Sequence, residues 1–93
     1  MNQTPKIRLT AQQAGYLTDL IASDSLFAEL IRSHPNIRLG DDGIALDRTD
    51  AERISDYFSD RLAKVGFDAS YEPNDEGVLL ESLIDKLFLL IAQ

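Results

Sequence analysis

Carboxylates crowd one connection in this sequence, and they are its best candidates for chemistry. Residues Gly66 to Gly77 read GFDASYEPNDEG, with no basic residue, one tyrosine at Tyr71, and four acids, which are Asp68, Glu72, Asp75 and Glu76. Carboxylates at this density fit a calcium site or a surface that binds a basic protein. An ordinary solvated loop is the third interpretation, because charged side chains are mostly exposed.

The spacing of these residues argues against calcium. Counted from Glu72, the loop places Asn74 third, Glu76 fifth and Gly77 sixth, as an EF-hand does. An EF-hand begins with aspartate, however, and needs a bidentate glutamate at the twelfth position, which is Leu83 here. We therefore expect no metal ligand in this loop.

Other catalytic arrangements are also poorly supported. The single histidine, His34, and the absence of cysteine leave no zinc site and no paired nucleophile. Asp56 and Asp60 share a helix face, but a carboxylate pair that cleaves sugars needs a cleft, which 93 residues without tryptophan are ill suited to build. The sequence predicts a protein that is not an enzyme and needs no cofactor.

A modified serine is a remote alternative. The triplet Asp24-Ser25-Leu26 resembles the prosthetic-group attachment site of acyl carrier proteins, which implies phosphopantetheine on Ser25. In that family a long loop precedes the triplet, whereas here a helical pattern runs almost directly into it. The favoured interpretation is that Asp24 and Ser25 form a helix N-cap.

Charge favours a basic protein as the partner. The net charge is −7, and residues 41–85 hold thirteen acids against four bases, a net of −9. Such a surface repels nucleic acid and anionic membranes. The longest apolar run, Leu87 to Ala92, is far shorter than the roughly 20 residues of a membrane span, and the N-terminus lacks a signal-peptide pattern. We expect a cytoplasmic protein.

Four helical patterns can position these residues. Thr10 with Gln13 forms a capping box before the first helix, and Pro35 ends the second helix near Ser33. Thr49 with Glu52 predicts a second capping box before the third helix. Either Asn74 or Asp75 caps the fourth, and Gly66 is expected to end the third in a left-handed conformation.

The expected fold is one mostly α domain over residues 1–93. About four helices form a small bundle, with a short β-hairpin over residues 36–47; an irregular loop is the alternative for that segment. Residues 1–9 are expected to be extended or frayed. The last helix is apolar on more than one face, which predicts either the central helix of the bundle or a helix buried in a homodimer.

The opening stretch also carries a resemblance. The residues that carry this likeness are Gly66-Phe67-Asp68, Tyr71, Pro73, Glu76-Gly77, Leu80-Glu81 and Leu83-Ile84-Asp85. Through them, about a quarter of the chain resembles the C-terminal part of short, acidic bacterial proteins. In general character the chain is similar to bacterial immunity proteins that neutralise secreted toxins, including those of contact-dependent growth inhibition. These likenesses imply a bacterial origin and a toxin as partner, and they assign no residue a role.

An immunity function gives the acidic loop a purpose. Nuclease toxins are basic, so an acidic inhibitor gains fast association, and a desolvated tyrosine is a favoured anchor for specificity. The expected partner-binding residues are Tyr71 as anchor and a set of acids on the loop and the third helix, which are Asp56, Asp60, Asp68, Glu72, Asp75 and Glu76. The competing, slightly favoured expectation for Tyr71 is that it folds back over the helix ends and fixes the loop. A self-associating structural or adaptor module is the alternative function.

Overall fold

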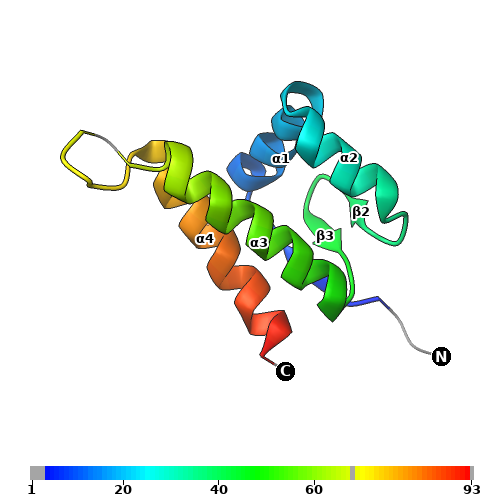
Figure 1. Cartoon of the computed structure of the whole chain (residues 1–93). Coiled ribbons are helices and arrows are strands. Elements are labelled where there is room, and N and C mark those ends of the chain that lie inside the picture. Colours follow the sequence, from blue (N-terminus) through cyan, green and yellow to red (C-terminus); the bar gives the residue numbers. More distant parts are fainter. Residues whose placement is uncertain (1–3, 68, 93) are drawn as a thin grey trace. The chain divides into compact units, whose positions relative to one another are not determined.

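The computed structural model describes residues 4–67 and 69–92. The chain divides into two compact units, and the boundary in the sequence falls between Asp50 and Ala51. Figure 1 shows the elements. Within the described residues the chain forms three strands and four helices, which in chain order are β1 (Lys6–Arg8), α1 (Ala11–Ser23), α2 (Ser25–Ser33), β2 (Arg38–Leu39), β3 (Gly43–Ala45), α3 (Arg48–Val65) and α4 (Asp75–Ile91). The predicted mostly α fold with a small hairpin is confirmed.

The sheet of the first unit has one more strand than the sequence suggested. Strands β2 and β3 form the predicted hairpin, and β1 adds to the other side of β3, so the order is β1-β3-β2 with every pair antiparallel. Ile44 on β3 lies opposite both Ile7 and Leu39 and is buried. Residues 6–8 are therefore extended, as expected, but they are held in a sheet.

Two side-chain caps fix the helices of the first unit. Thr10 Oγ1 accepts a hydrogen bond from Gln13 N at 3.1 Å, while Gln13 Oε1 accepts one from Thr10 N at 2.9 Å, which is the predicted capping box. Asp24 Oδ1 accepts from Leu26 N at 3.0 Å and caps α2, so the N-cap interpretation is confirmed. Ser25 is the exposed first residue of that helix.

The predicted cap of α3 is wrong by two residues. Asp47 Oδ1 accepts a hydrogen bond from Asp50 N at 2.8 Å, and the helix begins at Arg48. Thr49 is thus already helical. Aspartate satisfies the free amides of a first turn at least as well as threonine does, so the earlier of two suitable residues starts the helix.

Buried residues follow one side of each helix in the second unit. On α3 the buried positions are Ala51, Ile54 and Phe58, whereas Val65 at the end of the helix is 36% exposed. On α4 they are four leucines at helical spacing, which are Leu80, Leu83, Leu87 and Leu90. Three large apolar residues on α4 are exposed, namely Val78, Phe88 and Leu89, so this helix buries only part of its apolar surface.

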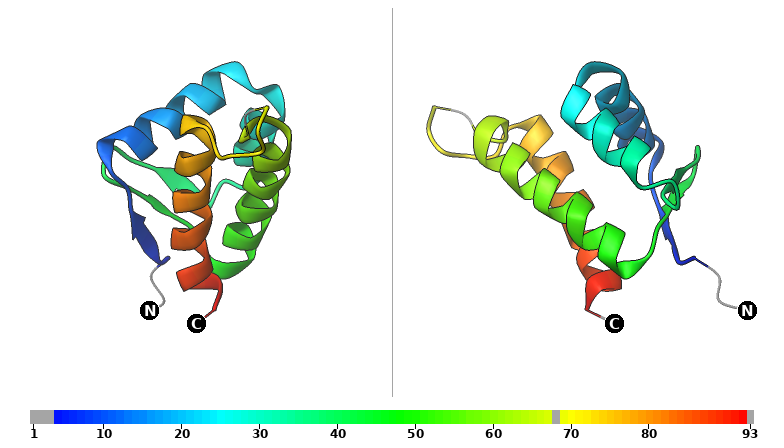
Figure 2. Two further views of the ribbon diagram at one scale, coloured as in Figure 1. Left: turned by 90° about the vertical axis from the view of Figure 1, so that its left-hand side faces the viewer. Right: turned by 45° about the vertical axis from the view of Figure 1, so that its right-hand side comes forward.

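The second unit is a helical hairpin. Helices α3 and α4 extend from a single connection, residues 66–74, which projects beyond their joined ends (Figures 1 and 2). Among the described residues, no helix is both long enough and apolar enough to cross a membrane.

Candidate functional site

Two glycines bring the ends of α3 and α4 together at the base of the acidic loop. A Cβ added at Gly77 would collide with the carbonyl oxygen of Gly66, and a Cβ added at Gly66 would lie 3.2 Å from Gly77 Cα and collide with Leu62. No described glycine has a positive φ, so the predicted left-handed cap at Gly66 is wrong. Glycine is needed at position 77 because the backbone of Gly66 lies against it, and at position 66 mainly because Leu62 does.

Asn74 ties the same two helix ends with three hydrogen bonds. Its side-chain Nδ2 donates to the carbonyl oxygen of Val65 at 2.7 Å, and its Oδ1 accepts from Gly77 N at 2.7 Å. Its backbone N donates to the carbonyl oxygen of Gly66 at 2.9 Å. The side chain therefore caps the start of α4, which decides between the two predicted candidates, Asn74 and Asp75, and it also satisfies a carbonyl at the end of α3.

A short backbone bridge completes the closure of the loop. Phe67 and Pro73 pair as an isolated antiparallel bridge just inside Gly66 and Asn74. The bridge and the Asn74 contacts fix the distance between the two ends of the connection. The residues between them form a small loop with closed ends.

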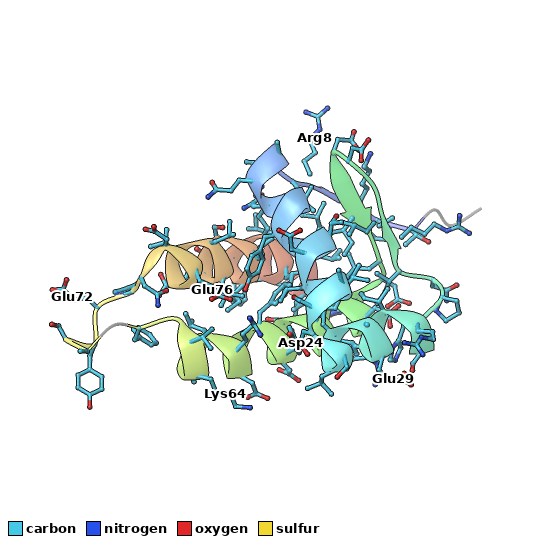
Figure 3. All side chains as sticks on the ribbon, turned by 90° about the horizontal axis from the view of Figure 1, so that it is seen from above. Arg8, Asp24, Glu29, Lys64, Glu72 and Glu76 are labelled. Carbon is cyan, nitrogen blue, oxygen red and sulfur yellow. The ribbon has the colours of Figure 1, made fainter. Side chains whose placement is uncertain are left out.

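Glu76 is engaged with the scaffold. Arg61 Nε donates to Glu76 Oε2 at 2.9 Å, and the two side chains are 27% and 30% exposed. Glu76 precedes Leu80 by one helical turn, on the buried side of α4, and Figure 3 shows it between the two helices. This ion pair links α3 to α4, so Glu76 does not contribute an unpaired charge to the acidic surface.

Tyr71 lies near the middle of the loop sequence and is 85% exposed. The expectation that it folds back over the helix ends is therefore wrong. Its φ is 62°, and it is the one described non-glycine residue with a positive φ. That conformation costs an L-residue about 1 to 2 kcal/mol, and it persists because the closed loop leaves the backbone little alternative. Glu72, the next residue, points outward from the same end (Figure 3).

The remaining acids fall into two groups. Asp75 is exposed in the first turn of α4, next to the loop. Asp56 and Asp60 are exposed on the side of α3 opposite its buried residues, and they precede the end of that helix by roughly 14 and 8 Å along its axis. Asp68 lies outside the described residues. The structure thus gathers Tyr71, Glu72 and Asp75 at the loop and leaves the α3 acids as a separate patch.

Sequence reasoning missed the residues that build the site. It named Asn74 as one of two candidate caps but did not foresee its second bond to α3, and it assigned no role to Arg61. The acidic stretch begins and ends with glycine, which was the available signal for a close helix contact. Among the described residues, no group of three or more His, Cys, Asp or Glu side chains is placed to hold a metal ion.

Comparisons of this chain with protein-family models, with curated proteins and with solved structures found no match.

Proposed function

We propose that this protein is a non-catalytic binding protein of bacterial origin that acts in the cytoplasm as an immunity protein. In this proposal it neutralises a basic, nuclease-like toxin by binding it through the loop between α3 and α4. The observation that carries the proposal is Tyr71, a large side chain that is 85% exposed in a left-handed backbone conformation. Strained residues persist where the surrounding structure determines them, and they concentrate at functional sites.

The rigid base of the loop supports this role. A partner that buries Tyr71 gains apolar contact area, and it loses little conformational entropy because the loop ends are already fixed by Asn74 and the Phe67–Pro73 bridge. Tyrosine is among the residues that dominate binding energy at protein interfaces. The exposed acids Glu72 and Asp75 form the polar surround of this anchor.

Net charge supports a basic partner. An acidic inhibitor and a basic toxin attract each other over about one Debye length, which raises the association rate at low salt. Neutralising Glu72 and Asp75 should therefore slow association, whereas truncating Tyr71 should speed dissociation. The two kinds of substitution therefore distinguish long-range electrostatic attraction, which acts on the association rate, from the contact of Tyr71, which acts on the dissociation rate.

The test is a pull-down with the full chain from the source bacterium, followed by binding kinetics with any stoichiometric basic protein recovered. Tyr71→Ala should raise the dissociation constant by about thirtyfold or more, and Glu72→Gln with Asp75→Asn should mainly reduce the association rate. Asp19→Asn with Glu29→Gln, which makes the same charge change in the first unit, is the matched control. Recovery of no basic partner, or a partner indifferent to Tyr71, would contradict the proposal.

A self-associating structural or adaptor module is the alternative function, through a homodimer of α4. The observation behind it is the exposure of Val78, Phe88 and Leu89, because large apolar side chains on one helix mark interaction surfaces. The like charges of Glu81 and Asp85 between them oppose a symmetric contact. Sedimentation velocity over a hundredfold range of concentration tests it. A dimer that Phe88→Ser disrupts would support the module, and a monomer throughout would remove it.

A further inference from the structure

The outer face of α4 carries an unusual order of side chains. Five exposed residues recur at a spacing of three, four, three and one, which places them along one side of the helix, and they are Val78, Glu81, Asp85, Phe88 and Leu89. The buried leucines occupy the opposite side. The exposed stripe therefore has apolar residues at both ends and two carboxylates in the middle.

These two acids are available for contact. Within the described part of the chain, neither Glu81 nor Asp85 makes an ion pair or a side-chain hydrogen bond. The neighbouring apolar side chains are more than half exposed, at 57% for Val78, 62% for Phe88 and 69% for Leu89. Exposed large apolar groups mark protein interaction surfaces, and the unpaired charges beside them restrict which partner can bind.

A second copy of the chain fits this stripe poorly. Two α4 helices could pair antiparallel about a two-fold axis, with Val78 of each copy against Phe88 of the other. That pairing also sets Glu81 of each copy against an acid of the other. A parallel contact sets each acid against its own equivalent. Both symmetric arrangements place like charges together at the centre of the interface, which is destabilising.

We propose that the outer face of α4 binds a basic amphipathic helix of a partner protein. Val78 and Phe88 are ten residues apart, about 15 Å along the helix, and the two acids lie at about 4.5 and 10 Å between them. The complementary helix carries apolar residues at its two ends and lysine or arginine at two positions between them. Helices that dock by one such face use anchors at the same kind of spacing. This surface is distinct from the Tyr71 loop, so it does not depend on the function proposed for that loop.

The probe is a phage-displayed library of 14-residue helical peptides in an alanine- and glutamine-rich host. Positions 1, 4, 8, 11 and 12 are randomised, the full chain is the bait, and peptides that also bind the Phe88→Ser, Leu89→Ser variant are discarded. We expect lysine or arginine at positions 4 and 8 and large apolar residues at 1, 11 and 12. Enrichment without a preference for bases, or no enrichment, would overturn the proposal.

The best enriched peptide then allows a quantitative check by fluorescence anisotropy. Glu81→Gln with Asp85→Asn should weaken its binding by about fivefold to tenfold, and Phe88→Ala by about thirtyfold. Asp41→Asn with Glu52→Gln is the matched control, because both residues are exposed acids outside α4, and it should leave binding within about twofold of wild type. An equal effect of the two double variants would show a general charge attraction and contradict a specific face.

Two further results would assign the face to another occupant. If Glu81→Gln with Asp85→Asn strengthens self-association in sedimentation velocity, and the peptide competes with the dimer, the occupant is a second copy. If amide chemical-shift changes on adding the peptide cluster around Tyr71 instead of α4, the peptide binds the loop. Either result would overturn the present assignment, and the toxin proposal is tested separately by the Tyr71 variants.

Discussion

At the scale of single residues, different positions close the acidic loop and expose a side chain from it. Gly66, Asn74 and Gly77 hold the ends of α3 and α4 together through backbone contact and hydrogen bonds. Tyr71 contributes to none of these contacts and is exposed. Substitutions at the two kinds of position should therefore act on different properties, stability in the first case and binding in the second.

Glycine at position 77 should be essential for stability, although it lies in a helix. Gly77→Ala is expected to lower the free energy of unfolding by about 1 to 3 kcal/mol, because the added methyl group collides with the Gly66 carbonyl and forces the helices apart. Gly15→Ala is the control, since nothing lies within 4 Å of the new Cβ in α1, and it should raise stability by up to about 1 kcal/mol. Urea unfolding measures both. Equal effects of the two substitutions would contradict the close contact.

Tyr71 should cost the fold some stability. Tyr71→Gly and Tyr71→Ala both remove the side chain, but only glycine adopts a φ of 62° without strain. We expect the glycine variant to be more stable than the alanine variant by up to about 1 kcal/mol, with the difference reduced by the greater flexibility of unfolded glycine. Thermal or urea unfolding decides this. An alanine variant at least as stable would show that the backbone at this position is not held left-handed.

At the scale of elements, contacts between segments decided most of what the sequence could and could not foretell. The caps at Thr10, Asp24 and Asn74 were predictable because each depends on residues within three positions of one another. Strand β1 was not, because it has only Ile7 as an apolar residue and exists through pairing with β3, more than thirty residues away. Its three residues carry no periodicity that could have been recognised.

The same reason explains the errors at the candidate site. The composition of the loop made it a candidate, and Tyr71, Glu72 and Asp75 do lie there in exposed positions. The partner of Glu76 is Arg61, fifteen residues earlier on another helix, and no local pattern connects the two. The left-handed residue was assigned to Gly66 because glycine is the usual choice, whereas the constraint on Gly66 comes mainly from Leu62 and only secondarily from the backbone at Gly77.

The ion pair between α3 and α4 should contribute modestly to stability. A double-mutant cycle with Arg61→Gln and Glu76→Gln is expected to give a coupling free energy of about 0.5 to 1 kcal/mol, because both side chains are only partly buried and remain screened by solvent. The cycle is measured by urea unfolding at low salt and should shrink as salt is added. A coupling near zero would show that the contact is merely geometric.

A second ion pair, in the first unit, should make stability depend on acid. The hydrogen bond from Lys6 Nζ to Asp42 Oδ1, 3.0 Å long, and the lysine charge hold the pKa of Asp42 below its ordinary value of 3.8. Because the folded-state pKa is lowered, this contact stabilises the fold above pH 3.8 and its contribution is lost as pH falls through the folded value.

Lys6→Met should therefore make the free energy of unfolding depend less on pH in that acidic range. Near neutrality the variant should be less stable by a constant amount, the lost contact, with the same pH dependence as the wild type. Unfolding measured from pH 2.5 to pH 6 checks this, and a direct titration of Asp42 by NMR gives the shift itself. An Asp42 pKa at or above 3.8 in the wild type would contradict the contact.

At the scale of the whole molecule, the excess of acid should oppose folding. Residues 41–85 carry a net −9, and bringing these charges into a compact chain costs free energy through mutual repulsion. Added salt screens that repulsion, so the free energy of unfolding should rise between 10 mM and 500 mM NaCl. Urea unfolding at the two salt concentrations measures it. A fall in stability would mean that the few attractive pairs outweigh the repulsion.

The closed base of the acidic loop has a practical consequence for protein engineering. Because Gly66, Asn74 and Gly77 meet through their own backbone and side-chain contacts, the segment between the helices can be exchanged while its end points stay about one hydrogen bond apart. A foreign peptide grafted in place of residues 69–72 would be presented on a stem of two helices, with its ends clamped in advance. The hairpin of α3 and α4 thus offers a small, cysteine-free frame for displaying short binding sequences.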